Sequence, residues 1–459
     1  MHQLMTIALA VLLVGAAETR PPLVDAAKTG DKDAITRLLA QKGVDVNATE
    51  GDGTTALHWA TYHDDLETAN QLIRAGSKVN AANDLGATPL WVASQNGSEA
   101  MVRRLLEAGA NPNLALLAGE TPVMVASRGG YPAAVELLIA RGANVNARGS
   151  RGQTALMWAV SEKHPNVVKV LLARGADIRA KSDVWSQVMA VEPHGYAPYN
   201  KSIPHGGETA LMFAARVGDL ESAKLLVTAG ANVNDTDAWG VSATTLAAHS
   251  DFREVAEFLL DKGADPNAAA AGFNALHNAI MHRDEKLAAS LLAHGADPNA
   301  ILRTWTPTRR SAADYSFLPE LVGSTPFWLA ARFTSPGIMN LLIQYKADPL
   351  VVHKVEHVVQ DRARGYIPRT EETTALMAAV GMGGGEAWAP VEASEREALI
   401  FAAVKMTIEL GVNVNAKGTD GRTALDAAKG LRFESVTKIL TDNGAKAGTG
   451  GARGAAPTP

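Results

Sequence analysis

The segment HKVEH, from His353 to His357, has the residue spacing most suggestive of catalysis in this sequence. In inverted zinc proteases the pattern H-x-x-E-H puts two histidines on one helix face, where they bind zinc while the glutamate acts as a general base. His353, Glu356 and His357 could do the same if this segment were helical. Three defined letters recur by accident, however, and the downstream carboxylates Glu409 and Glu434 lie in ordinary sequence, so no third ligand can be assigned. We expect residues of a solvated loop here.

The rest of the sequence gives little support for other kinds of catalytic site. The sequence has no cysteine, which excludes disulfides, thiolate metal sites and thiol nucleophiles. The glycine-rich stretch Gly381–Trp388 lacks the Gly-Lys-Ser/Thr ending of a phosphate-binding loop, so we interpret it as a flexible turn. The sequence contains no nucleophile elbow, dinucleotide-binding fingerprint or calcium loop. We therefore predict a protein that is not an enzyme and has neither a cofactor nor a metal site.

Composition and charge narrow the class of partner. Hydrophobic residues make up 47% and charged residues 20%, as in ordinary soluble globular proteins. Lys and Arg number 43 against 48 Asp and Glu, and this formal charge of −5 is too balanced for a protein that neutralises nucleic-acid phosphates. We therefore expect a protein partner and no nucleic acid.

The first 17 residues form an apolar stretch that ends in small residues and is too short to cross a bilayer comfortably. We interpret residues 1–17 as a secretory signal peptide. Its positive region is weak because only His2 is present, so a buried N-terminal helix and a retained anchor stay open as alternatives. The signal predicts an exported protein, periplasmic or extracellular. We expect this protein not to be inserted in the membrane once the signal is removed, and we expect it to be monomeric.

The elements that must position any functional residue are set by an internal repeat. The motif TALHWA at Thr55 recurs every 33 residues, at Thr88, Thr121 and Thr154, and again at Thr209 and 33 residues later at Ser242. Looser copies bring the series to about eleven units; they begin at Pro21, Asn274, Thr325, Thr374 and Thr423. Such a period indicates stacked supersecondary units.

Each regular unit has a second anchor 21 residues after its threonine, such as GANPN at Gly109 or GADPN at Gly263. Paired apolar residues, for example Leu105 with Leu106, lie between the anchors. Thr caps a first helix, and Gly supplies the left-handed residue that ends a second helix. The pattern therefore predicts helix, turn, helix and a polar turn. One such pair cannot cover its own leucines, so neighbours must stack.

This combination of T-P-L-H-x-A and G-A-D-x-N at a period of 33 residues strongly resembles the ankyrin repeat, over roughly residues 20–447. The resemblance implies an all-α solenoid of helix-turn-helix units with β-hairpin fingers, and a concave groove that binds other proteins without catalysis. It also implies that His58 and His277 form hydrogen bonds between neighbouring units. Methionines share their position in other copies and predict packing; they are Met124, Met157, Met212 and Met377.

Four insertions interrupt the array, at about residues 183–206, 301–323, 352–372 and 381–397. The first three fall where the fingers lie and should enlarge one edge of the groove, whereas the fourth lies between the two helices of its unit. The insertions carry aromatic residues suited to binding: Trp185, Tyr196, Tyr199, Trp305, Tyr315 and Phe317. We expect a disordered tail over residues 448–459.

The end of each first helix faces the groove in the ankyrin family, and the positions seven and eight residues after the motif threonine recurrently carry cationic or titratable groups. Together with a finger tryptophan they form the predicted partner-binding set of Tyr62, His63, Asn96, Arg128, Arg216, Trp239, His249, His282 and Arg332. We therefore interpret the protein as a non-enzymatic scaffold for a partner in the cell envelope. Two alternatives remain: a metal-dependent hydrolase that uses HKVEH, and an accessory protein that sequesters a small molecule or protects another enzyme.

Overall fold

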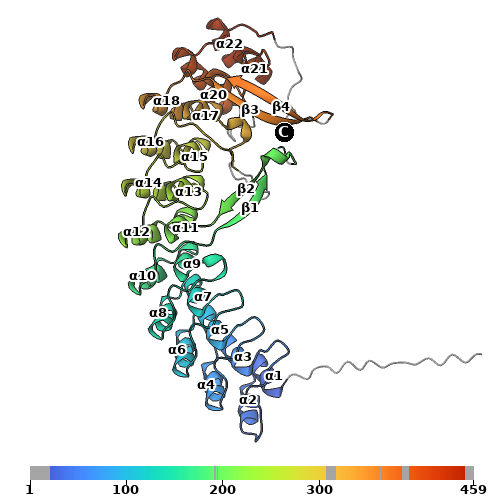
Figure 1. Cartoon of the computed structure of the whole chain (residues 1–459), viewed down its shortest axis with the longest axis vertical. Helices are drawn as coiled ribbons and strands as arrows, with labels where there is room; N and C mark the ends of the chain where they lie inside the picture. The colour runs from blue at the N-terminus through green and yellow to red at the C-terminus, as the bar shows by residue number, and fades with distance from the viewer. Residues whose placement is uncertain are drawn as a thin grey trace, which may run out of the picture. The chain divides into compact units, whose positions relative to one another are not determined.

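The computed structural model describes residues 21–190, 193, 195–306, 317–361, 363–384 and 392–449 (Figure 1). The predicted signal peptide at residues 1–17 lies outside the described residues, as does the predicted tail from residue 450. The chain divides into two compact units, one made of residues up to 150 with 173–175 and one made of the remaining residues. Each is described separately below.

The first unit contains short helices in consecutive pairs. Each first helix packs against its own second helix and against the first helix of the next pair. The helices are α1 (Pro22–Thr29), α2 (Lys32–Leu39), α3 (Ala56–Tyr62), α4 (Leu66–Arg74), α5 (Pro89–Asn96), α6 (Glu99–Glu107), α7 (Pro122–Arg128) and α8 (Pro132–Ala140).

The second unit continues with helix pairs of the same kind and adds four strands. Its α-helices are α9 (Ala155–Ser161), α10 (Pro165–Ala173), α11 (Ala210–Val217), α12 (Leu220–Thr228), α13 (Ala243–His249), α14 (Arg253–Asp261), α15 (Ala275–Met281), α16 (Glu285–Ala293), α17 (Pro326–Arg332), α18 (Pro336–Gln344), α19 (Ala375–Ala379), α20 (Ala393–Glu409), α21 (Ala424–Leu431) and α22 (Glu434–Asp442). The remaining elements are the strands β1 (Trp185–Ala190), β2 (Asn200–His205), β3 (His353–Asp361) and β4 (Gly365–Thr373), and the 3₁₀ turns η1 (Ser150–Gly152), η2 (Ala197–Tyr199) and η3 (Pro319–Leu321).

The motif residues form the helices through capping. The Thr88 hydroxyl accepts a hydrogen bond from the Trp91 amide at 3.2 Å, and Pro89 occupies the first helical position. Gly97 then ends α5 with a φ of 69°, a conformation that costs glycine little. Each such N-cap contributes about 1 kcal/mol to helix stability. Apart from α20, the α-helices have at most nine residues, so caps and packing must both support them.

In each unit the second helices contribute a repeated buried leucine to the core. Leu72, Leu105 and Leu138 are fully buried in the first unit, and Leu171 and Leu259 repeat the position in the second. Each buried leucine stabilises the fold by about 1.5–3 kcal/mol. The methionine column is also buried throughout, which confirms that these residues serve packing; it comprises Met124, Met157, Met212 and Met377.

Polar ladders join successive repeats. The asparagine that ends the second anchor reaches the next repeat: Asn80 donates to the Gly109 carbonyl at 3.2 Å and accepts from the Asn111 amide at 2.7 Å. Neighbouring fingers are linked by backbone hydrogen bonds such as that from Leu117 to Leu85 at 2.9 Å. These repeated bonds explain the asparagine of the motif and hold the finger row in register.

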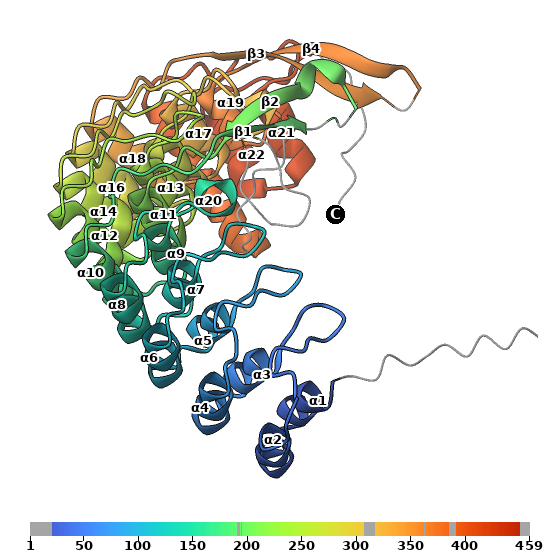
Figure 2. The same cartoon turned by 60° about the horizontal axis from the view of Figure 1, so that its bottom comes forward.

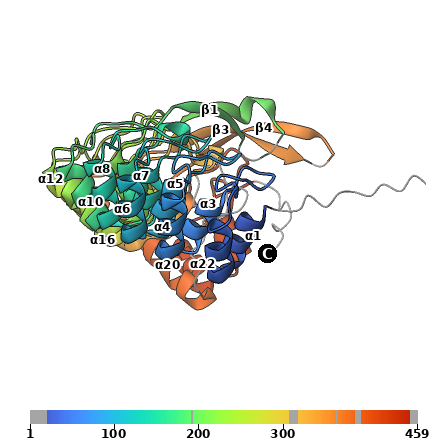
Figure 3. The ribbon, with the colours of Figure 1, turned by 90° about the horizontal axis from the view of Figure 1, so that it is seen from below.

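The prediction of an all-α fold is wrong for the insertions. β1 pairs with β2 in an antiparallel hairpin, Trp185 opposite His205, and β3 pairs with β4, His353 opposite Thr373. Buried and exposed residues alternate along the first half of β3, and a period of two favours a strand over a helix. Both hairpins lie on the finger side of the second unit, as Figures 2 and 3 show, away from helices such as α16 and α20.

Candidate binding surface

The predicted partner-binding residues of the first unit lie at the ends of first helices. Tyr62 and His63 are exposed, and their rings pack edge to face at 5.4 Å. Asn96 donates hydrogen bonds to the carbonyls of Thr61 and Tyr62, both at 3.1 Å. Arg128 is half-buried and pairs with Glu120 at 2.6 Å. Asn96 therefore donates to the carbonyls at the end of the preceding first helix, where the Thr61 carbonyl also accepts from the Asp64 amide, in addition to any role in binding.

The second unit repeats this arrangement. His282 contacts the His249 carbonyl through Nε2 at 2.9 Å, and the two rings lie 6.5 Å apart. Arg216 is exposed and forms an ion pair with Glu208, whose carboxylate is buried. Trp239 is half-buried and packs edge to face on Phe273 at 5.5 Å. Arg216 is thus the most accessible member of the set in this unit, while the histidines and Trp239 are partly covered.

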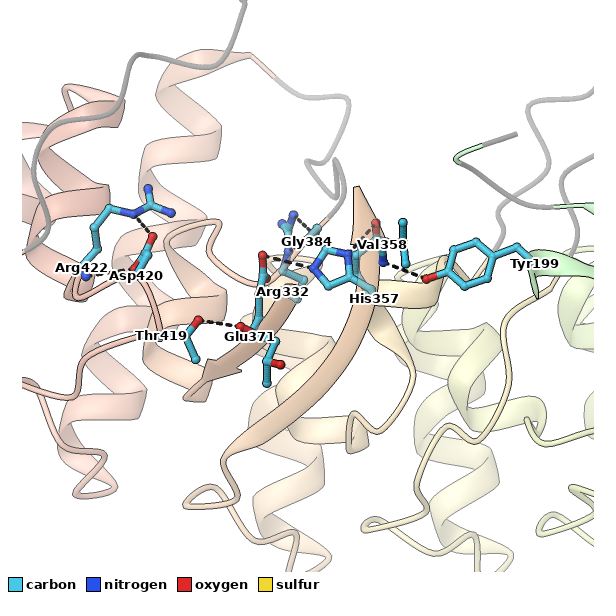
Figure 4. A network of polar contacts seen from close by, with 11 residues as sticks. Tyr199, Arg332, His357, Val358, Glu371, Gly384, Thr419, Asp420 and Arg422 are labelled. Carbon is cyan, nitrogen blue, oxygen red and sulfur yellow. Dashed lines mark hydrogen bonds and ion pairs between the residues drawn. The ribbon is translucent and has the colours of Figure 1, made fainter. Parts of the chain in front are cut away.

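Arg332 corrects the prediction, because it is only 2% exposed. Its Nε and Nη2 atoms donate to the Gly384 carbonyl at 3.1 and 2.7 Å (Figure 4). Burial lowers the pKa of its guanidinium to about 10, although the charge of Glu371 opposes the shift. Arg332 therefore cannot reach a partner in this conformation. The β3–β4 hairpin and the loop after α19 cover the position that is open at Arg216.

The HKVEH segment is also corrected, because it is strand β3 rather than a solvated loop or a helix. His353 and His357 are 1% and 4% exposed and face inward, whereas Glu356 faces the opposite, exposed side. His353 packs against the Trp328 ring at 4.2 Å, and its Nε2 lies 3.1 Å from the Val322 carbonyl. The described residues contain no group of three or more His, Cys, Asp or Glu arranged to hold a metal ion. The helical geometry that the hydrolase hypothesis required is absent.

His357 is held between two carboxylates. Its Nδ1 lies 3.4 Å from Glu320 and its Nε2 lies 3.3 Å from Glu371. Burial by itself would lower the pKa of His357, but the interactions with Glu320 and Glu371 outweigh it and raise the pKa to about 9. The same contact with His357 lowers the pKa of Glu371. His357 is consequently a buried cation at neutral pH, and its contact with Glu320 links β3 to η3.

The two hairpins contact each other although they lie far apart in sequence. The Tyr199 hydroxyl accepts a hydrogen bond from the Val358 amide at 2.9 Å (Figure 4). The Tyr196 ring lies 5.1 Å from that of Tyr199 and 5.3 Å from that of Tyr366. We call these four residues the hairpin clasp. Sequence reasoning noted the tyrosines as insertion aromatics but missed the clasp, because no local pattern indicates which insertions touch.

Aromatic residues of the insertions form a small core beneath the β1–β2 hairpin. Ile203 and Trp305 are buried there, with Tyr199 and Trp239 packed against them. Phe317 extends this core, since its ring lies 5.7 Å from that of Phe273. Tyr315 lies outside the described residues. These contacts fix the hairpin to the finger row, so the predicted aromatics Tyr199, Trp239, Trp305 and Phe317 are largely committed to structure.

The outer part of the hairpin remains available. Val184, Trp185 and Val188 are among the exposed large hydrophobic side chains of the described residues. Arg151 lies over the Trp185 ring at 4.7 Å, and Lys201 lies over the Trp305 ring at 5.0 Å. The arrangement offers apolar, aromatic and cationic groups side by side, which suits recognition of another chain.

Stacked helix pairs with a finger row define the class of repeat scaffolds, and comparison with known proteins gives the family. The profile described as ankyrin repeats (3 copies) matches residues 23–116, 114–182, 194–270 and 211–301, which is more than half of the chain. The protein belongs to the ankyrin-repeat family. Repeats of this family generally serve as protein–protein interaction scaffolds.

Several relatives share this array. The chain is 28% identical over 249 residues, half of its length, to a putative palmitoyltransferase ZDHHC13 of Danio rerio, and 26% identical over 145 residues to human Rabankyrin-5. It is 39% identical over 94 residues to a putative ankyrin repeat-containing protein of Treponema pallidum. The chain spans 33%, 10% and 32% of these relatives, respectively. The human ASB11 ankyrin repeat domain, wholly matched by 54% of this chain, is 31% identical with a TM-score of 0.44.

Proposed function

We propose that this protein is a non-enzymatic scaffold of about eleven ankyrin repeats that binds another protein in the cell envelope. The ladders at Asn80 and the finger-to-finger bond at Leu117 support this function, because they preorganise the surface and so limit the conformational entropy lost on association. The chemistry of the candidate site also supports a binding role, because the HKVEH segment, whose spacing is the most suggestive of catalysis, anchors a hairpin instead.

The observation that carries the proposal is where the exposed apolar side chains lie. The described residues include eleven large exposed hydrophobic side chains, and nine of them lie on fingers, in finger insertions or at first-helix ends; these are Tyr62, Leu85, Leu117, Val184, Trp185, Val188, Ile301, Val352 and Tyr366. Exposed apolar groups gathered on one side of a soluble protein mark an interaction surface. The other two, Tyr345 and Leu350, follow the second helix α18, so we place the binding surface of each unit on its finger side.

Export and assembly state form part of the same proposal. The apolar residues 1–17 support secretion to the periplasm or the exterior, and the protein acts as a monomer there. Among the described residues no helix is long and apolar enough to cross a membrane.

Site-specific photocrosslinking in the native envelope tests the function. Benzoylphenylalanine replaces Leu85 or Leu117 at neighbouring fingertips, and Leu350 serves as the matched control because it is exposed and apolar but lies in a loop after a second helix. The scaffold function predicts a discrete crosslinked partner from both fingertips that is absent from the Leu350 protein. Identical bands from all three positions, or no partner at any of them, would refute it.

A further inference from the structure

β1 is unusually exposed for an apolar strand. Val184 and Val188 are 61% and 68% exposed, and Trp185 is 37% exposed. The corresponding valines of the other hairpin, Val355 and Val358, are buried. Since both hairpins extend the same finger row, the difference marks β1 as the strand with an uncovered apolar face.

The free edge of β1 lacks the features that normally prevent strand addition. Natural edge strands are protected by charged residues or proline. Residues 184–190 contain neither, whereas β2 carries Lys201 and Pro204, and β4 carries Pro368 and Arg369. Within the described residues β1 pairs only with β2. At its base, the Asp183 amide bonds to the Arg151 carbonyl of the neighbouring finger at 2.8 Å, so an added strand would continue an existing row.

Two cations give one face of the β1–β2 hairpin a charge preference. Arg151 lies on Trp185, and Lys201 stands opposite Met189 in the hairpin, so the two cationic positions are four residues apart along one face of β1. That separation corresponds to about 13 Å of extended chain. Neither cation forms an ion pair with another described residue, although the whole chain carries a charge of −5. Val184 and Val188 lie on the opposite face, because side chains alternate along a strand.

We propose that β1 accepts an extended segment of a partner protein as a third strand, and that this segment alternates apolar side chains, packed beside Val184 and Val188, with acidic ones on the face that carries Arg151 and Lys201. The inference rests on the proposed scaffold function and names the chemistry of its partner. Backbone bonds supply part of the affinity, and the alternating side chains supply specificity.

The probe is a fluorescent octapeptide of alternating Val and Glu, capped at both ends, with an alternating Val and Lys peptide for comparison. Fluorescence anisotropy at low salt measures its Kd for the full chain. The double variant Arg151→Glu/Lys201→Glu should raise the Kd about tenfold, because each exposed ion pair is worth up to about 1 kcal/mol. Val188→Ser should raise it about threefold. The matched control Arg364→Glu/Lys417→Glu makes the same charge change at two other exposed cations and should leave the Kd within twofold.

Hydrogen exchange reports the binding mode. The Val–Glu peptide should slow amide exchange within residues 184–190 and leave β3 unchanged. Equal affinity for the two peptides, an unchanged Kd in the Arg151→Glu/Lys201→Glu protein, or protection elsewhere than at β1 would overturn the inference. Fingertip crosslinking through Leu85 is independent of this edge, so a partner captured there while the peptide fails to bind would reject the strand addition and keep the scaffold function. Peptide binding at β1 without any fingertip partner would keep the strand addition and reject the fingertips as the place where the partner binds.

Discussion

The buried cation at His357 gives a quantitative prediction about pH. The shift of its pKa from the ordinary 6.5 to about 9 corresponds to about 3 kcal/mol, at 1.36 kcal/mol for each pH unit. Because the folded pKa is the higher one, this stabilisation is fully present below pH 6.5 and is lost as the pH rises through about 9. The lowered pKa of Glu371 affects stability at acidic pH. Its contribution to stability is present above pH 4.5, the ordinary pKa of glutamate, and is lost as the pH falls and the carboxylate becomes protonated.

The perturbation is His357→Gln, and the assay is native-state hydrogen exchange of the β3 and β4 amides, corrected for intrinsic rates, between pH 6.5 and 9.5. Local opening is the appropriate quantity because repeat arrays do not unfold as one two-state body. In the wild type the opening free energy should fall by about 1.4 kcal/mol per pH unit as pH approaches 9. In His357→Gln it should be about 3 kcal/mol lower at neutral pH and nearly independent of pH in this range.

The control is His294→Gln, which removes a more exposed histidine in the same unit that lies 3.3 Å from Asp261. It should leave the exchange of β3 and β4 unchanged at every pH. A wild-type pH slope that persists in His357→Gln would show that another group titrates there, and the assignment of the buried charge to His357 would then be wrong.

Three further predictions concern packing and the clasp. Arg332→Ala should destabilise the second unit by about 2–5 kcal/mol in urea unfolding, because it leaves a cavity and removes two hydrogen bonds to the Gly384 carbonyl. Arg364→Ala, which removes an exposed arginine of the same unit, should cost less than about 1 kcal/mol; equal costs would contradict the burial of Arg332. Tyr199→Phe should reduce the protection of the Val358 amide by about 1 kcal/mol without changing helix content, as measured by hydrogen exchange and circular dichroism. Unchanged protection would show that the Val358 amide does not donate to the Tyr199 hydroxyl. Leu138→Ala should cost about 2–5 kcal/mol in urea unfolding, and a cost below 1 kcal/mol would contradict a tightly packed leucine column.

The amino-acid sequence determined the repeat itself. Thr88, Pro89 and Gly97 act within one helix, and their roles follow from local hydrogen bonding and backbone conformation. The leucine column and the asparagine ladder recur at fixed spacing, so a contact between neighbouring repeats is also readable from the period. Local energetics repeated at a constant interval thus specified the ankyrin fold and its binding class.

Only the tertiary structure decided which of these surfaces stayed open. Arg216 and Arg332 share one motif position, yet a hairpin inserted after α18 buries Arg332 and leaves Arg216 in solvent. Tyr199 meets Val358 across 159 residues, a separation that no periodicity encodes. The physical reason is that insertions fold against whatever the stacked repeats bring near them, so their burial and charge depend on three-dimensional proximity rather than on the pattern of their own residues.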